Sequence, residues 1–343
     1  MFLDNYVFMK KNGFLLLVVV FALTACSPEK RKADISDSDV EVKIGRFDQD
    51  FWAMNRSDLP QALSDLNKLY PDVLPVYLER VVEFGKVGDA QTIQTLNHFF
   101  ADTAVIRLYT DSEQKFQQVS SYETELTDAF RRAHYFFPER QIPKLYMHVS
   151  GLNQSMVVGE GFISASIDTY LGADYPLYDR IGIYSYLYQN MIPEKLVPDY
   201  VVAWLTSEFP FVPHTGELME ELLYRGKILY VASVLLPNFP ESLLIGYTSE
   251  QWQWCKDNEA NMWLAMISGK HLFSRDHLLR VKYLNDAPFT SLFSQASPGR
   301  AGAYVGWQII ESYMDNNQDV TPAELMNMVN ANTLLQKSDY NPR

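Results

Sequence analysis

Hydrophobic residues recur at helical spacing through the first third of the chain. Leu59, Leu63 and Leu66 lie three or four residues apart. This spacing places apolar side chains on one face of a helix. It therefore predicts a mostly helical first third. The segments that show it are residues 59–70, 76–84, 93–100 and 116–137.

Shorter apolar runs predict strands in two places. Near the N-terminus, Val42 and Ile44 alternate with polar residues ahead of Phe47, and a helical turn with Phe51 and Trp52 follows. Beyond residue 144, three short runs are separated by glycine-containing segments, which is the pattern of hairpin-connected strands. These runs cover residues 145–149, 156–158 and 162–166.

The last third returns to helical spacing. Apolar residues predict helices over residues 218–236, 250–267 and 301–314, and Pro237 ends the first of them. Thr321 followed by Pro322 is typical of a helix start. The predicted fold class is α+β, predominantly helical with a small antiparallel sheet between two helical parts.

The N-terminus has the order of a lipoprotein signal peptide. Lys10 and Lys11 precede an apolar run over residues 14–25, which ends at Leu-Thr-Ala-Cys with Cys26. The run is shorter than the roughly 20 residues that a transmembrane helix needs. Residues 1–25 are therefore predicted to be removed, and Cys26 to carry acyl chains such as palmitate. The alternative is an ordinary secretory signal with a cysteine near its cleavage site by chance.

Composition limits the remaining possibilities. Residues 26–41 are predicted to form a lipidated flexible tether, and residues 42–343 a single large domain. The net charge of −13 argues against nucleic acid as a partner, since phosphate binding needs a concentrated basic face. Cys26 and Cys255 are the two cysteines, so lipidation of the first leaves none for an internal disulfide.

Short motifs occur in a specific order and spacing between residue 42 and the C-terminus. They lie at residues 44–48, 168–172, 226–230, 258–263, 288–290, 297–300 and 306–310. Together these segments resemble the gliding motility-associated lipoprotein family of the Bacteroidetes, usually called GldB. The resemblance implies an accessory lipoprotein of a cell-envelope machine that powers gliding and is coupled to protein secretion. It also implies envelope protein partners and a domain that faces the periplasm.

The family is also distantly similar to zinc-peptidase-like domains, so a degenerate scaffold of this kind is expected. Such domains carry His-Glu-x-x-His on a helix, which places two imidazoles on one zinc ion. Residues 198–208, where that helix is expected, contain no histidine. None of the six histidines has another four residues away: they are His98, His134, His148, His214, His271 and His277. We therefore expect no metal and no cofactor.

Charged residues crowd the predicted start of the helix over residues 218–236. Glu221 and Arg225 form an i, i+4 pair, and acids in a first turn favour the positive end of a helix dipole, so a structural role is sufficient. The functional alternative is that a glutamate here faces a vestigial cleft.

Glu259 and Arg300 form a second candidate pair. Trp252, Cys255 and Glu259 fall at helical spacing, so the carboxylate is expected among aromatic rings, where it needs a partner. Arg300 follows a glycine and is the expected partner. The pair is either a buried bridge, a ligand-binding pair or two surface positions.

No sequence motif specifies a reaction. The chain contains no Gly-x-Ser-x-Gly and no phosphate-binding loop, so it is not expected to be an enzyme. The first hypothesis is a non-enzymatic component of a membrane-associated assembly. The alternatives are a peptide- or glycan-binding module on a degenerate peptidase scaffold, and a hydrolase with an unrecognised site.

Overall fold

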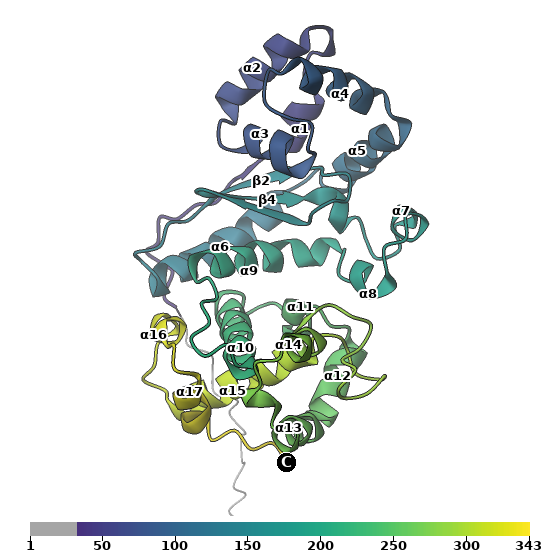
Figure 1. Cartoon of the computed structure of the whole chain (residues 1–343). Coiled ribbons are helices and arrows are strands. Elements are labelled where there is room, and N and C mark those ends of the chain that lie inside the picture. Colours follow the sequence, from purple (N-terminus) through teal and green to yellow (C-terminus); the bar gives the residue numbers. More distant parts are fainter. Residues whose placement is uncertain (1–32) are drawn as a thin grey trace, which may run out of the picture.

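The computed structural model describes residues 33–343, so Cys26 and the predicted signal peptide lie outside it. A small sheet has helices α1–α5 on one side and α6 and α9 on the other, and the remaining long helices lie beyond α9 (Figure 1). No helix among the described residues is long and apolar enough to span a bilayer.

The helices of the first half are α1 (Phe47–Trp52), α2 (Leu59–Leu69), α3 (Val73–Val76), α4 (Ala90–Ala101), α5 (Thr103–Lys115), α6 (Ser120–Phe136), α7 (Pro176–Arg180) and α8 (Ser185–Tyr188). Those of the second half are α9 (Leu196–Glu208), α10 (Leu218–Leu235), α11 (Glu241–Ile245), α12 (Ser249–Asp257), α13 (Glu259–Ser268), α14 (His277–Leu284), α15 (Ala301–Asn316), α16 (Pro322–Asn327) and α17 (Ala331–Ser338).

The sheet is mixed, which corrects the prediction of an antiparallel sheet. β1 (Ile44–Gly45), β2 (Lys144–His148), β3 (Met156–Gly159) and β4 (Phe162–Ser166) lie in the order β1-β2-β4-β3. β1 pairs parallel to β2 and β2 parallel to β4, while β3 and β4 form the expected hairpin. Every residue of β4 is buried, as is usual for a strand with parallel pairing and helices on both faces.

Aromatic side chains fill the space between the sheet and α1–α5. Phe47 packs edge-on against Tyr77, and Trp52 stacks on Tyr109 with ring centroids 4.1 Å apart. The Tyr77 hydroxyl donates to the carbonyl of Val149, at the end of β2, over 2.8 Å. The first helices are thereby fixed to the strand ends.

The helices α6 and α9 form a layer beneath the sheet. Tyr200 of α9 donates to the carbonyl of Tyr146 in β2 at 2.6 Å. Trp204, one turn further on, packs edge-on against Phe130 of α6 and donates its Nε1 hydrogen to the carbonyl of Gln141. This layer also packs against α10, so it joins the sheet to the second helical part.

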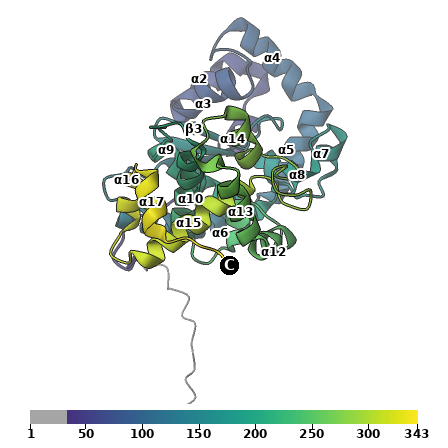
Figure 2. The same cartoon turned by 60° about the horizontal axis from the view of Figure 1, so that its bottom comes forward.

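The helices α10 and α15 pack at the centre of the second part, with α12–α14, α16 and α17 around them (Figure 2). A Cβ atom on Gly226 would lie 2.3 Å from the carbonyl oxygen of Gly306. A Cβ atom on Gly306 would lie 2.0 Å from the carbonyl oxygen of Leu222. The two backbones therefore approach so closely that only glycine fits at either position.

Most of the predicted helices are confirmed, but several differ: residues 77–81, for example, form a π-helix after the short α3, and α14 was not predicted. The helix predicted over residues 250–267 is divided at Asn258 into α12 and α13. The helix α5 was not predicted, because only Leu108 and Tyr109 of its large apolar residues are buried. At the C-terminal end, Thr321 forms the expected N-cap and makes a capping box with Glu324.

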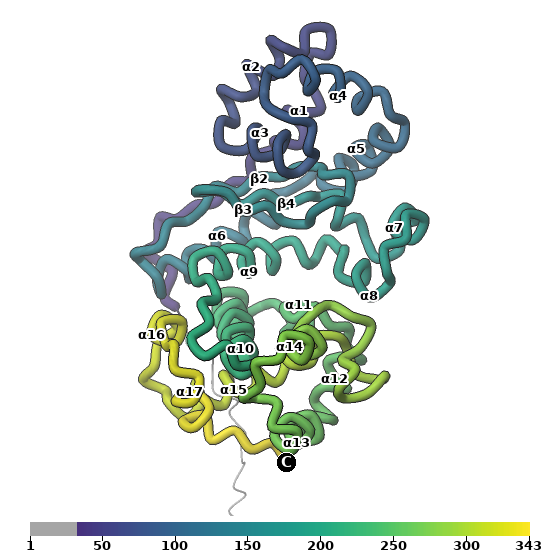
Figure 3. Tube along the Cα trace, in the orientation of Figure 1, coloured from purple at the N-terminus to yellow at the C-terminus, as the bar shows by residue number. Residues whose placement is uncertain are grey.

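The segment that precedes β1 is attached to α6. It runs beside the end of this helix towards the sheet (Figure 3). Arg131 donates its Nε hydrogen to the carbonyl of Val40 at 2.9 Å, and the amide of Val42 donates to Thr127 at 3.0 Å. The end of the predicted tether therefore belongs to the folded body.

Replacing Gly306 with alanine is expected to lower the free energy of unfolding by about 3 kcal/mol, the upper end of the usual cost of overpacking. The added methyl group meets backbone atoms of α10, which cannot turn aside. Urea unfolding measures the change.

Gly269→Ala is the matched control, because its φ of −74° suits alanine and the atoms nearest to its methyl group belong to the side chain of His271 and not to backbone. Its effect is expected to stay below about 1 kcal/mol. Equal effects of the two substitutions would contradict the close approach of α10 and α15.

Candidate functional site

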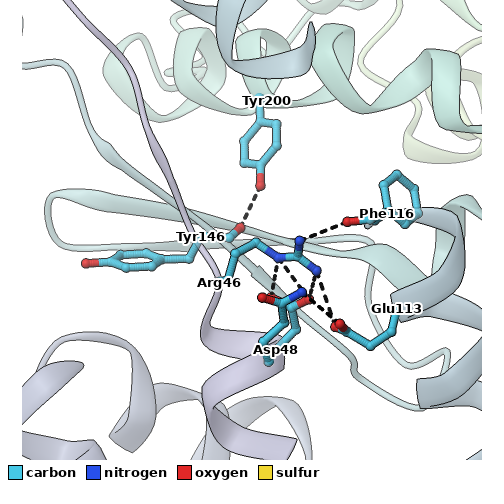
Figure 4. A network of polar contacts seen from close by, with 7 residues as sticks. Arg46, Asp48, Glu113, Phe116, Tyr146 and Tyr200 are labelled. Atoms are coloured by element: carbon cyan, nitrogen blue, oxygen red, sulfur yellow. Dashed lines mark hydrogen bonds and ion pairs between the residues drawn. The ribbon is translucent and has the colours of Figure 1, made fainter. Parts of the chain in front are cut away.

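Arg46, between β1 and α1, contacts two carboxylates (Figure 4). Its Nε and Nη2 donate to Asp48 at 3.0 and 2.5 Å, and Nη2 also lies 3.2 Å from Glu113 of α5. Its Nη1 donates to the carbonyl of Phe116 at 2.8 Å. Asp48 is completely buried. This part of the family-like segment therefore joins the sheet edge to α1 and to the end of α5.

This cluster has more acidic than basic groups, since two carboxyl groups share one guanidinium. Burial raises the pKa of Asp48, the guanidinium of Arg46 acts against this rise, and Glu113 adds to it. Gln49 donates to the second oxygen of Glu113 at 2.8 Å, which fixes this carboxylate in place. Because its members satisfy one another, we assign the cluster a structural role.

Glu221 and Arg225 form the predicted i, i+4 pair, at 2.9 Å. Arg225 also donates to the carbonyl of Leu284 at the end of α14. Neither residue lines the two grooves described below. The pair therefore connects α10 to α14, in agreement with the structural alternative.

The predicted contact between Glu259 and Arg300 is wrong. Glu259 accepts hydrogen bonds from Tyr304 at 2.9 Å and Tyr340 at 3.0 Å. Arg300 contacts Asp286 at 2.8 Å and donates to the carbonyl of Ile245. The break at Asn258 makes Glu259 the first residue of α13, so the single helical face assumed for it does not exist.

A serine and a histidine meet inside the sheet, although no sequence motif predicted this pair. His148 Nδ1 and Ser164 Oγ of the neighbouring strands lie 2.7 Å apart, and both residues are buried. Burial lowers the pKa of His148 to about 3, so its imidazole is neutral at physiological pH. Neither residue lines the grooves below, and within residues 33–343 no group of three potential metal ligands occurs.

The larger of the two grooves has a volume of about 500 Å³ and lies between α6 and the turn after α10. Prolines and apolar side chains form its floor, and Glu125, Asp128, Arg132 and Glu194 are its charged members. Arg132 donates to the carbonyl of Leu235, at the edge of the groove. None of these four charged residues is fully buried, so the groove resembles ordinary surface.

The second groove, about 220 Å³, contains a buried charge. Its walls are residues 209–212 after α9, one face of α10, and residues 326–329 at the end of α16 and directly after it. Lys227 of α10 lines it, is 8% exposed, and donates to the carbonyls of Met326 at 3.3 Å and Met328 at 2.9 Å. No ion pair of Lys227 occurs in the part of the chain that the structure covers. Burial lowers the pKa of this lysine to about 8.

A second cavity of similar size adjoins this groove and includes the first turn of α10. Glu220 lines both cavities, so a glutamate of the predicted group does face a cleft. Its carboxylate accepts hydrogen bonds from the amides of His214, Thr215 and Gly216. Burial acts to raise the pKa of Glu220, but these backbone donors outweigh it and the pKa is lowered. Glu220 therefore shapes the loop at the groove and is not a free base.

The candidate site is the groove at Lys227. The sequence analysis included this lysine in the family-like segment 226–230 but did not predict a site there. A lysine directly before the apolar residues Ile228 and Leu229 was the available signal. The burial of its amine depends on Met326 and Met328, which are about a hundred residues away in the sequence.

The ion cluster around Arg46 (Figure 4) predicts that substitutions of Arg46 and Asp48 have unequal effects on stability. Arg46→Met leaves two carboxylates without their cation and is expected to lower the free energy of unfolding by about 3–5 kcal/mol. Asp48→Asn should cost less, because Glu113 still faces the guanidinium. A double-mutant cycle by urea unfolding should give a coupling energy above about 1 kcal/mol.

The exposed pair Asp65 and Lys68, 2.7 Å apart, is the control for this cycle. Solvent screens it, so its coupling energy is expected to stay below about 1 kcal/mol. Equal coupling in the two pairs would show that burial does not strengthen the cluster at Arg46.

Comparison with known proteins supports the resemblance that the sequence segments indicate. The model of a family described as gliding motility protein GldB matches residues 28–342. No curated protein and no solved structure matches the chain. The likeness to zinc-peptidase-like domains thus remains an expectation. Because the family match covers nearly the whole chain, the protein belongs to the GldB family of gliding motility lipoproteins.

Proposed function

We propose that this chain is a lipid-anchored, extracytoplasmic accessory component of a gliding-motility machinery or its associated secretion system. The observation that carries the proposal is the family match over residues 28–342. The basic pair, short apolar run and Leu-Thr-Ala-Cys sequence at the N-terminus support the anchor at Cys26. In this proposal the folded body faces the periplasm and contacts other envelope proteins.

We further propose that this role is not catalytic. Ser164 and His148, a pair among the described residues that suggests a nucleophile and its base, are buried and line neither groove. A nucleophile and its base need room for a substrate beside them. At the groove of Lys227, the carboxylate of Glu220 is held by backbone amides. These features favour a protein that binds and positions partners.

The anchor and the role can be tested in the same cells. Cys26→Ala in the chromosomal gene should abolish incorporation of radioactive palmitate into the protein. It should also impair colony spreading or secretion, because the body is no longer held at the membrane. Cys255→Ala is the matched control: its thiol is buried, so label and spreading should be retained.

Label that persists on the Cys26→Ala protein would disprove the anchor. Deletion of the whole gene without any effect on movement or secretion would disprove the proposed role.

A further inference from the structure

The amine of Lys227 has bonding capacity that the described chain does not use. An ammonium has three N–H donors, and the carbonyls of Met326 and Met328 accept two of them. The side chain is 92% buried, and both of these methionines line the same groove. A buried cation without an anion is costly. One donor and one positive charge are therefore available for a ligand.

A second donor lies next to Lys227. Tyr224 precedes it by three residues and so shares its face of α10. The Tyr224 hydroxyl is buried and makes no hydrogen bond of good geometry within residues 33–343. Burial raises its pKa, although a contact with Thr206 acts to lower it. The ring of Phe211 packs against that of Tyr224 with centroids 5.1 Å apart.

The rest of the groove is apolar apart from His214, Asn327 and Glu220, and the carboxylate of Glu220 is occupied by backbone amides. Val212 and Val329, on different walls, are each 64% exposed although both are hydrophobic. A cavity of about 150 Å³ holds a benzene ring, so 220 Å³ accommodates one large side chain together with a small charged group. The neighbouring cavity at Glu220 continues the groove along the first turn of α10.

The polar and apolar groups of the groove determine the charge and the chemical class of a ligand that would bind there. Two donors beside two backbone carbonyls suit a singly charged carboxylate, whereas a phosphate carries more charge and needs more donors. The apolar walls require a hydrophobic group next to that carboxylate. A polypeptide that ends in an apolar residue presents both, since its last side chain is adjacent to the free α-carboxylate.

We propose that the groove binds the C-terminus of a partner polypeptide, with its α-carboxylate on Lys227 and Tyr224 and its apolar last side chain between Val212 and Val329. The inference rests on the proposed function for the view that the ligand is a protein. Its test uses purified components, so its failure would leave the proposed role in motility or secretion intact.

The test measures binding of a fluorescent peptide to the full-length lipoprotein in detergent. The probe is fluorescein-Gly-Ser-Lys-Ser-Phe-Leu with a free carboxylate, compared with the same peptide as a C-terminal amide. Fluorescence anisotropy should show saturable binding of the acid and binding of the amide that is weaker by about tenfold or more, because the amide removes the charge.

Substitutions in the groove test whether the peptide binds there. Lys227→Met should weaken binding of the acid to the level of the amide, and Tyr224→Phe should weaken it by a smaller factor. Val212→Asp should also weaken binding, because it places a negative charge at the exposed rim. Leu278→Asp is its matched control: Leu278 is 65% exposed but does not line the groove. The rim variants carry the test if Lys227→Met lowers the melting temperature.

Three results would overturn the proposal: equal binding of acid and amide, no binding of either peptide, or equal effects of Val212→Asp and Leu278→Asp. Palmitate and inorganic phosphate are the competing ligands to be tested. Binding of one of these that depends on Lys227, without binding of the peptide, would assign the groove to that ligand instead.

Discussion

The close approach of α10 and α15 is the constraint on which the second half of the molecule depends. Gly226 and Gly306 let the two backbones touch, and other helices of this part pack around them. The same contact fixes the rotation of α10 about its axis. That rotation places Arg225 towards α14 and Lys227 towards the segment between α16 and α17. A methyl group at either glycine would therefore disturb the groove as well as the packing.

The basic residues Arg46 and Lys227 are both largely buried but have different kinds of partner. At Arg46 the guanidinium meets two carboxylates and a carbonyl, so its charge is matched within the first half of the chain. At Lys227 the amine meets carbonyls alone, and burial lowers its pKa. The first arrangement joins elements together. The second leaves the amine of Lys227 without a carboxylate partner among the described residues. Buried charges of this kind are often found at sites that bind a ligand.

The sequence contained enough to predict most helices, the strands and the capped start at Thr321, since these follow from local periodicity and capping. The direction of β2 relative to β4 could not be predicted, because the chain passes β4 to form β3 before it returns. The partners of Glu259 and Arg300 come from distant segments, and a break at Asn258 changed the face assumed for Glu259. The site at Lys227 was hidden for the same reason: periodicity shows which face of a helix is apolar, but not which loop covers it.

The attachment of Val40 and Val42 to α6 limits how far the folded body can lie from a lipid on Cys26. With Cys26 as the anchor, 13 residues (27–39) separate it from Val40, the first attached residue of the body, and such a segment spans at most about 50 Å. Partners held in the same membrane within this distance are met at a high effective concentration. If Cys26 carries the lipid, partners in the same membrane would need only weak individual contacts, because the anchor would already hold them close to the body.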